Sequence, residues 1–320
     1  MSNYLSAEKR AQVVAMLCEG VGGRAIGRIA DVNRETVGKI GREVGEGYAR
    51  LHDQLFVGMK PERLELDEAW SFVHTKQGHL PDPEARTADT ADHGDQYLYV
   101  GIDADKKAIL AYHVGKRTAA NTQGFMVDLA SRVLTSPQIT TDGFRQYIPA
   151  IDRAFGPDAD YAMCIKEYLA VCSVEAARRY SPNTTVSVER IKISGEPDDE
   201  HISTAFVERQ NLTLRMLTKR FSRLSNGFSK NLRNHRAAVD LYVGYYNLCW
   251  QHETLGMTPA MAVGATKERW TAQKYMDECM RYSMSYPPDR IGEQGHETLL
   301  ANRRAARNAG RATLAAQARK

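Results

Sequence analysis

The stretch Leu64-Glu-Leu-Asp-Glu-Ala-Trp-Ser-Phe-Val73 alternates between two classes of side chain along most of its length. Large apolar residues recur at one parity, and Asp67 falls on the other parity, among small residues. Alternation with a period of two is typical of a β-strand, because successive side chains point to opposite faces. The stretch therefore predicts a strand that projects a carboxylate from its middle.

The residues that follow this strand predict an alternation of strands and helices. A polar loop spans residues 77–95, and residues 181–201 have no regular pattern. The remaining elements are strands at 97–103, 108–114, 138–141 and 161–168, and helices at 120–134, 144–155 and 203–220. This order predicts an α/β fold, a mixed sheet with helices on both faces.

Three short helices are predicted ahead of the sheet, at 7–20, 24–30 and 34–42. Ser6 and Asn33 precede the first and the third of them, and both residue types are favourable N-caps. Residues 43–60 predict a helical tail and a linker. The sequence therefore predicts a small all-α unit in front of the sheet.

The second and third of these helices are joined by a tight turn and expose Arg34, Glu35 and Lys39. That pattern is typical of a helix-turn-helix unit, whose second helix enters the major groove of DNA. A plain three-helix bundle without DNA contacts has the same pattern. Gly38 and Gly41 count against a stable recognition helix, because each costs a helix roughly 1 kcal/mol relative to Ala.

The composition is that of an ordinary globular protein of about two domains. The chain has 320 residues, of which 42% are hydrophobic and 26% charged, and no apolar run is long enough to span a membrane. Its N-terminus lacks the apolar core of a signal peptide, and its five cysteines include no CxxC pair. Both features favour a cytoplasmic protein without a structural zinc site. We expect domains at 1–58, 59–265 and 266–320, the last being a helical, basic tail.

The formal net charge of +4 hides an uneven distribution of charge. Residues 61–208 hold 24 Asp and Glu against 15 Lys and Arg, whereas residues 209–236 hold eight Lys and Arg and no acid. Residues 301–320 hold six basic residues and no acid. An acidic middle next to a basic stretch indicates two kinds of partner, metal cations and a polyanion.

Three carboxylates stand where a site is expected. Asp67 lies in the middle of the first strand, Asp142 directly follows the strand at 138–141, and Glu208 lies near the start of the last predicted helix. Polar residues at spacings of three or four positions share the helix face of Glu208. They are Asn211, Arg215 and Lys219.

Such a set suits phosphodiester cleavage by two metal ions. Two Mg²⁺ ions about 3.5–4 Å apart polarise the scissile phosphate and activate a hydroxyl nucleophile, and hard oxygen ligands suit Mg²⁺. The ordinary alternatives are a salt bridge for Asp67, a turn at Asp142 and an ion pair for Glu208. Because the acidic middle holds many carboxylates, the spacing alone leaves both interpretations open.

Longer strings around the three carboxylates resemble the DDE transposases of bacterial insertion sequences, most of all those of the IS-one type. These strings are Leu66–Phe72, Thr140–Gly143 with Tyr147, and His201–Arg215. The similarity continues through residues 220–226 and 228–230. A distal string, shared loosely with integrases, contains Tyr245-Tyr-Asn247, His252, Leu255 and Thr258-Pro259-Ala260. The resemblance covers roughly residues 1–270.

The resemblance implies an RNase H-like fold, with Asp67, Asp142 and Glu208 as catalytic residues and as ligands of two Mg²⁺ or Mn²⁺ ions. It implies double-stranded DNA as substrate, namely the terminal inverted repeats of an insertion sequence and a target. Water activated by the metals frees a 3′-OH at the element end, which then attacks the target. Residues 156–202 become an insertion that carries one strand. Joining two ends requires at least two active sites, so we expect a homo-oligomer, at least a dimer.

Cations of the third helix and of the basic stretch are the expected DNA contacts. They are Arg34, Lys39, Arg42, Arg209, Arg215, Lys219, Arg220, Arg223 and Lys230. Asn211, on the helix face of Glu208, is the expected supporting residue of the site, and His252 is a second supporting candidate for which a structural hydrogen bond is at least as good an alternative. Glu68 is predicted to be structural, because it points to the other face of the strand from Asp67.

Two rival functions remain open. One is a DNA-binding regulator derived from a transposase and without catalysis, which the presence of all three carboxylates disfavours. The other is an RNase H-fold nuclease that acts on branched DNA, which the helix-turn-helix pattern disfavours. The tail at 301–320 is either a nonspecific DNA arm or a plain terminus.

Overall fold

The computed structural model describes residues 5–81, 90, 92–168, 185–222 and 226–285. Its helices are α1 Ala7–Cys18, α2 Gly23–Ala30, α3 Arg34–Leu55, α4 Ala119–Arg132, α5 Tyr147–Phe155, α7 Ala205–Leu217, α8 Leu232–Leu248, α9 Pro259–Ala262 and α10 Ala272–Ser285. Its strands are β1 Arg63–Val73, β2 Gly94–Asp103, β3 Ile109–Gly115, β4 Gln138–Thr141, β5 Tyr161–Tyr168 and β6 Thr185–Ser194. Arg223 and the predicted tail at 301–320 lie outside the described residues.

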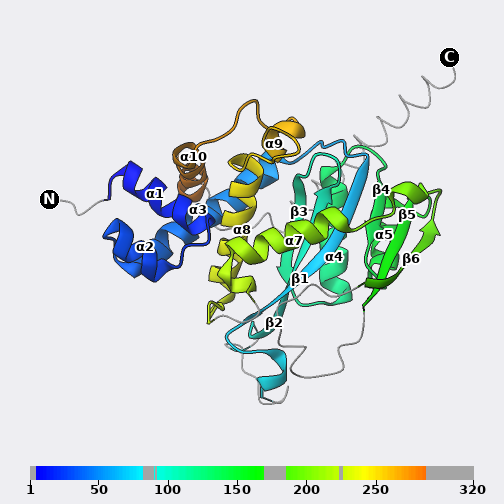
Figure 1. The fold of residues 1–320 in the computed structure, drawn as a ribbon, viewed down its shortest axis with the longest axis horizontal. Helices are drawn as coiled ribbons and strands as arrows, with labels where there is room; N and C mark the ends of the chain where they lie inside the picture. The colour runs from blue at the N-terminus through cyan, green and yellow to red at the C-terminus, as the bar shows by residue number, and fades with distance from the viewer. Residues whose placement is uncertain (1–4, 82–89, 91, 169–184, 223–225, 286–320) are drawn as a thin grey trace.

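The strands form one six-stranded sheet in the order β3-β2-β1-β4-β5-β6. Strand β1 pairs antiparallel with β2 and parallel with β4, and β5 continues the sheet parallel to β4. The predicted mixed α/β sheet is therefore confirmed. Figure 1 shows α7 crossing one face of this sheet and α4 lying behind it.

Strand β6 was not predicted, since residues 181–201 have no regular pattern. It pairs antiparallel with β5 at the edge of the sheet. Residues 185–190 are exposed on both faces of the strand, so no core selects an alternation of apolar and polar side chains there. The described residues between β4 and α7 accordingly hold two strands in place of the one expected.

Helix α7 ends at Leu217, three residues before the predicted end. Thr218 has extended backbone angles, φ −118° and ψ 97°, and a short 3-10 helix follows at Lys219–Phe221. The change of direction lets Phe221 pack in the core, where it is 1% exposed. Lys219 therefore does not share the helix face of Glu208, which corrects the expectation from spacing.

The three N-terminal helices form with the predicted caps. The Ser6 side chain accepts a hydrogen bond from the Lys9 backbone N–H at 3.2 Å, and the Asn33 side chain accepts one from the Glu35 N–H at 2.7 Å. Helix α3, however, continues without a break through the predicted tail to Leu55. The unit is therefore built on a longer third helix than its sequence pattern suggests.

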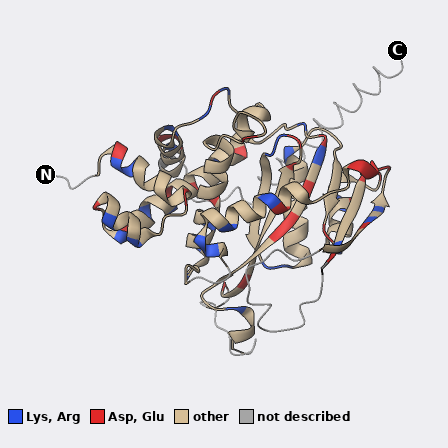
Figure 2. Ribbon diagram, viewed as in Figure 1, with Lys and Arg blue, Asp and Glu red and all other residues tan. Residues whose placement is uncertain are grey.

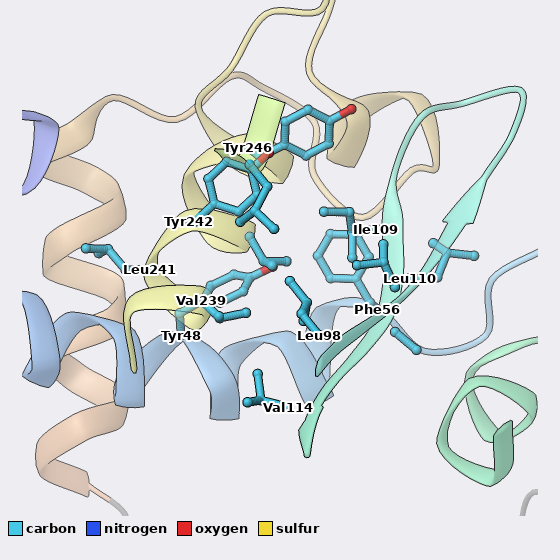
Figure 3. Packing of buried hydrophobic residues seen from close by; sticks show 14 of the residues in the cluster. Tyr48, Phe56, Leu98, Ile109, Leu110, Val114, Val239, Leu241, Tyr242 and Tyr246 are labelled. Atoms are coloured by element: carbon cyan, nitrogen blue, oxygen red, sulfur yellow. The ribbon is translucent and has the colours of Figure 1, made fainter. Parts of the chain in front are cut away.

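Helix α3 shares its core with the sheet. Figure 3 shows Tyr48 of α3 and Phe56, which directly follows α3, packed with side chains of α8 and of the β2–β3 hairpin. Asn247 of α8 fixes this layer to the sheet, because its amide both accepts from the Ile109 N–H at 3.0 Å and donates to the Ile109 carbonyl at 2.9 Å. The division at 1–58, 59–265 and 266–320 stays a prediction.

No helix among the described residues is long and apolar enough to cross a membrane.

Two glycines of α3 let three helices approach backbone to backbone. A Cβ atom at Gly45 would lie 2.0 Å from the Ala237 carbonyl oxygen of α8, and one at Gly47 would lie 1.9 Å from that of Cys279 on α10. Real Cβ atoms do not come so close to another atom, so α8 and α10 could not pack at these points against any other residue. The glycines therefore set the spacing of the helical layer.

We expect Gly45→Ala to destabilise the protein by about 3 kcal/mol or more, because a backbone carbonyl has no room to move aside. Gly38→Ala is the matched control, since it lies in the same helix and a Cβ there would have no atom within 4 Å. The control should be neutral or more stable by up to about 1 kcal/mol. Urea unfolding measures both, and equal stability of the two variants would contradict the packing argument.

Candidate metal centre

The parallel pairing of β1 with β4 brings two distant aspartates together. Leu66 of β1 lies opposite Thr141 of β4 in the register of the two strands. Asp67 follows Leu66 in β1, and Asp142 follows Thr141 directly after β4 ends. Strands in a sheet lie about 4.8 Å apart. The register therefore makes Asp67 and Asp142 neighbours, although they are 75 residues apart in sequence.

Glu68 lies beside this pair, although its position on the strand predicts that it points to the other face from Asp67. One carboxylate oxygen each of Asp67, Glu68 and Asp142 lies within 4.8 Å of the others. The prediction of opposite faces overlooked the edge of β1, because β4 pairs with β1 only as far as Leu66. Beyond that point both side chains can reach round the unpaired edge towards Asp142.

The three carboxylates are crowded and differ in exposure. The side chain of Glu68 is 2% exposed and that of Asp142 is 38% exposed. Burial and the charge of Asp142 raise the pKa of Asp67 to about 6. Burial and the same charge raise the pKa of Glu68 to about 7. A cation placed among these oxygens would relieve both the repulsion and the loss of hydration.

The donor set fits a hard divalent cation. All available ligand atoms are carboxylate oxygens, which Mg²⁺ and Mn²⁺ prefer. The buried Oε1 atom of Glu68 forms no hydrogen bond of good geometry among the described residues, although the buried Tyr147 hydroxyl interacts with the Glu68 carboxylate. An unsatisfied buried carboxylate oxygen is costly, and a metal bond would satisfy it.

Arg117 holds the cluster from the solvent side. Its Nε donates to Glu68 Oε2 at 3.0 Å, and its Nη2 lies 3.6 Å from Asp142 Oδ2. The guanidinium carbon also lies 3.9 Å from the centre of the Phe144 ring. Sequence reasoning missed Arg117, because it stands in the β3–α4 connection with no motif around it.

Helix α7 reaches the cluster through Asn211. Its Nδ2 donates to Asp67 Oδ2 at 2.8 Å, while Asp67 Oδ1 accepts from the Glu68 backbone N–H at 2.7 Å. Both oxygens of Asp67 thus have a fixed direction. Asn211 is the residue predicted to support the site, and its side chain contacts Asp67.

Glu208 lies on the same helix but outside the set of three. Its Oε1 accepts from Lys166 Nζ of β5 at 2.6 Å and from the Thr204 hydroxyl at 2.8 Å. The side chain is 42% exposed, and its charge is near enough to help raise the pKa of Asp67. Lys166, like Arg117, was not found by sequence reasoning, because a lysine on a strand gives no signal by itself.

A buried carboxylate of β1 fixes the start of α7. Glu65 is 3% exposed, and its Oε2 accepts from the backbone N–H groups of Phe206 at 2.7 Å and Val207 at 2.9 Å. The first N–H groups of a helix have no partner within the helix, and a negative charge is favourable there. Glu65 therefore fixes the start of α7 over β1, at a position two residues before Asp67 in the strand.

The other expected site residues differ in exposure. Arg34 and Lys39 are exposed on α3 and Arg42 is half-buried there; Arg209 and Lys230 are exposed, and Arg215 and Arg220 are half-buried. His252 makes a backbone hydrogen bond to Met257, and its ring Nδ1 is buried without a hydrogen bond among the described residues. Lys107 and Arg209 lie near enough to help burial lower its pKa.

The comparisons with known proteins do not identify the chain. No family model matches it, and no curated protein matches it. Among solved structures, a crystal structure of a pre-cleavage Mos1 transpososome is 10% identical, with a TM-score of 0.27, over 90% of this chain and 82% of that chain. Similarity at this level carries no argument about fold or function.

We expect Glu68→Gln to weaken Mn²⁺ binding by on the order of tenfold or more, because it removes an anionic ligand oxygen from a crowded all-oxygen set. Isothermal titration calorimetry with MnCl₂ measures the affinity. The control is Glu62→Gln, an exposed glutamate that directly precedes β1. Equal affinity of the Glu68 and Glu62 variants would show that Glu68 is only a structural partner of Arg117.

We expect Glu65→Leu to lower the free energy of unfolding by about 3 kcal/mol, because two α7 N–H groups lose a charged acceptor. The same variant should also bind Mn²⁺ more weakly, since Asn211 loses its alignment with Asp67. Glu65→Gln keeps one oxygen acceptor and should be milder in both measurements. Glu62→Leu is the exposed control, and a Glu65→Leu protein of equal stability would refute the seating role of Glu65.

Proposed function

We propose that this protein is a metal-dependent DNA transposase that cleaves the ends of an insertion sequence and joins them to target DNA. The observation that carries the proposal is the β1–β4 register, which sets Asp67 beside Asp142 under the helix that bears Glu208. Acidic residues on adjacent strands and on a covering helix are the arrangement that the DDE resemblance implies. Figure 2 shows acidic ribbon on β1 next to α7.

The sheet topology supports an RNase H-like fold for this function. Three antiparallel strands, β1 to β3, are followed by β4 and β5 parallel to β1, which gives the order β3-β2-β1-β4-β5. The first carboxylate sits in the central strand and the second at the end of its parallel neighbour. Strand β6 extends this sheet at the edge.

The chemistry expected at the centre is in-line phosphoryl transfer. Divalent metal bound to the carboxylates would polarise the scissile phosphate and activate water or a 3′-OH. Asn211 keeps Asp67 oriented, and Lys166 and Thr204 keep Glu208 on the same side of the sheet. Arg117, 36% exposed at the cluster, can turn one N–H towards a phosphate oxygen.

The DNA partner is proposed from the cations of the chain. Helices α2 and α3 are proposed as a helix-turn-helix that recognises the terminal inverted repeats. The acid-free basic stretch at 209–236 begins directly after Glu208, and we propose that its cations bind DNA phosphates. Two ends held together require at least two copies of the chain.

One observation favours the rival, a DNA-binding regulator without catalysis. Glu208 is paired with Lys166 and stands outside the three-carboxylate set. A transposase needs Glu208 to leave that ion pair or to share it when metal and DNA bind. The same cleavage experiment decides between the two functions.

We expect Asp142→Asn and Glu208→Gln each to abolish Mg²⁺-dependent cleavage of DNA that carries the inverted repeats flanking the gene. Binding of the same DNA should stay within a few-fold, because DNA phosphates are bound by cations and neither substitution removes a cation. A gel assay for cleavage and fluorescence anisotropy for binding measure the two effects.

The matched control for these variants is Glu200→Gln, an exposed glutamate shortly before α7, which should cleave as the unmodified protein does. Cleavage retained in either active-site variant would refute the site assignment. Unmodified protein that binds the ends but never cuts them would establish the regulator.

A further inference from the structure

A groove separates the N-terminal helices from the segment that follows α7. It has a volume of about 830 Å³. One wall consists of residues from the α1–α2 connection, the start of α2 and the first two turns of α3. The opposite wall consists of residues 217–220, 226–228 and the start of α8. Figure 1 shows α2 and α3 on one side and the end of α7 on the other.

The two walls meet directly at one end of the groove. Gly20 has φ 75°, and a Cβ atom there would lie 2.9 Å from the Leu217 carbonyl oxygen. A Cβ atom at Gly22 would lie 3.4 Å from Lys219 Nζ. This close approach fixes α2 and α3 relative to the end of α7, so the groove is a built feature of the fold.

Positive charge lines both walls of the groove. The cations are Arg24, Arg34, Lys39 and Arg42 on the N-terminal wall, and Lys219 and Arg220 on the other. Glu35 is the one carboxylate among the lining residues described. The cations of two segments that are nearly 200 residues apart in sequence therefore converge on one space. Such convergence focuses a positive potential, which attracts a polyanion.

Arg220 shows that the groove wall is prepared for an anion. Its guanidinium is half-buried, and burial lowers its pKa. No carboxylate pairs with it among the described residues, and its side chain donates to the Ser229 hydroxyl at 2.6 Å. The Ser229 hydroxyl is in turn hydrogen-bonded to Nδ1 of buried His235, and His235 Nε2 lies 3.0 Å from the Ser71 hydroxyl of β1. The charge is thus held in place by neutral groups.

We propose that this groove binds the phosphate backbone of the same DNA duplex that α3 contacts, so that recognition and catalysis share one continuous DNA-binding surface. The inference rests on the proposed function, because it takes DNA as the substrate of the cluster. The exposed face of α3, with Arg34 and Lys39, is the face that lines the groove. DNA on α3 therefore lies against Lys219 and Arg220 as well.

The groove also lies close to Glu208 along α7. Leu217 forms part of the groove wall and ends the helix that carries Glu208. Nine residues of α-helix separate them, which is about 14 Å along the axis. That length corresponds to about four base pairs of DNA at 3.4 Å each. Backbone held at the Leu217 end of the groove therefore lies within a few base pairs of Glu208.

The test measures DNA affinity against salt concentration, in EDTA and without divalent metal, by fluorescence anisotropy with a labelled duplex. Arg24→Gln and Lys219→Gln each remove one cation from opposite walls of the groove. Each should lower the slope of log affinity against log salt by about 0.9, because one phosphate contact is lost. The double variant should lower it by about 1.8.

The matched controls make the same substitutions, Arg to Gln and Lys to Gln, at positions outside the groove. Arg153→Gln replaces an exposed arginine of α5, and Lys267→Gln replaces an exposed lysine of the α9–α10 connection; neither residue lines the groove. Both should leave the slope unchanged. A loss in the controls equal to that in the groove variants would overturn the proposal, since the DNA would then bind the general basic surface. A loss for Arg24 without one for Lys219 would also overturn it.

Failure of this proposal differs from failure of the proposed function. Binding in EDTA does not depend on metal held by the carboxylates. The groove variants can therefore show an unchanged salt slope while the unmodified protein still cleaves DNA with Mg²⁺. Conversely, a protein that never cuts DNA can still show the predicted salt slopes. Circular dichroism of each variant, unchanged from the parent, shows that the loss of a cation and not of the fold is measured.

Discussion

The hydrogen bonds from the first turn of α7 to the buried carboxylate of Glu65 decide where the candidate site lies. Two backbone N–H groups at the start of α7 need an acceptor, and water cannot reach the sheet surface to supply one. Glu65 projects from β1 to provide it. Because Glu65 and Asp67 have the same parity on one strand, the helix that Glu65 seats also covers Asp67. Asn211 then falls within hydrogen-bond distance of Asp67, one turn further on from the capped end.

The carboxylates of the site form ion pairs with two different cations. Arg117 neutralises Glu68 and Asp142 from the β3–α4 connection, and Lys166 neutralises Glu208 from β5. Each pairing comes from a different structural element, so the cluster is assembled only when the whole sheet has formed. Burial and the charge of Asp142 still raise the pKa values of Asp67 and Glu68, and for Glu68 the charge of Arg117 offsets this only in part. That residual cost is what a divalent cation would remove.

A second constraint acts at the other end of the molecule. Gly45 and Gly47 bring α3 against the backbones of α8 and α10, and Asn247 fixes α8 to β3. Gly20 brings the α1–α2 connection against Leu217 at the end of α7. These contacts place the cations of α3 opposite those that follow α7. The positions of the two basic segments are therefore as firmly determined as the carboxylate cluster.

Local sequence determined the elements whose pattern repeats over a few residues. Alternation set β1, polar turns bounded the hairpin, and Ser6 and Asn33 marked the helix starts, because each signal depends only on near neighbours. Asp67, Asp142 and Glu208 could be selected by motif. The tertiary structure alone decided that Glu68 joins the cluster, that Arg117 and Lys166 face it, and that Lys219 turns away from Glu208. Each of these depends on where a strand stops pairing or a helix ends, and such ends are set by packing between segments distant in sequence.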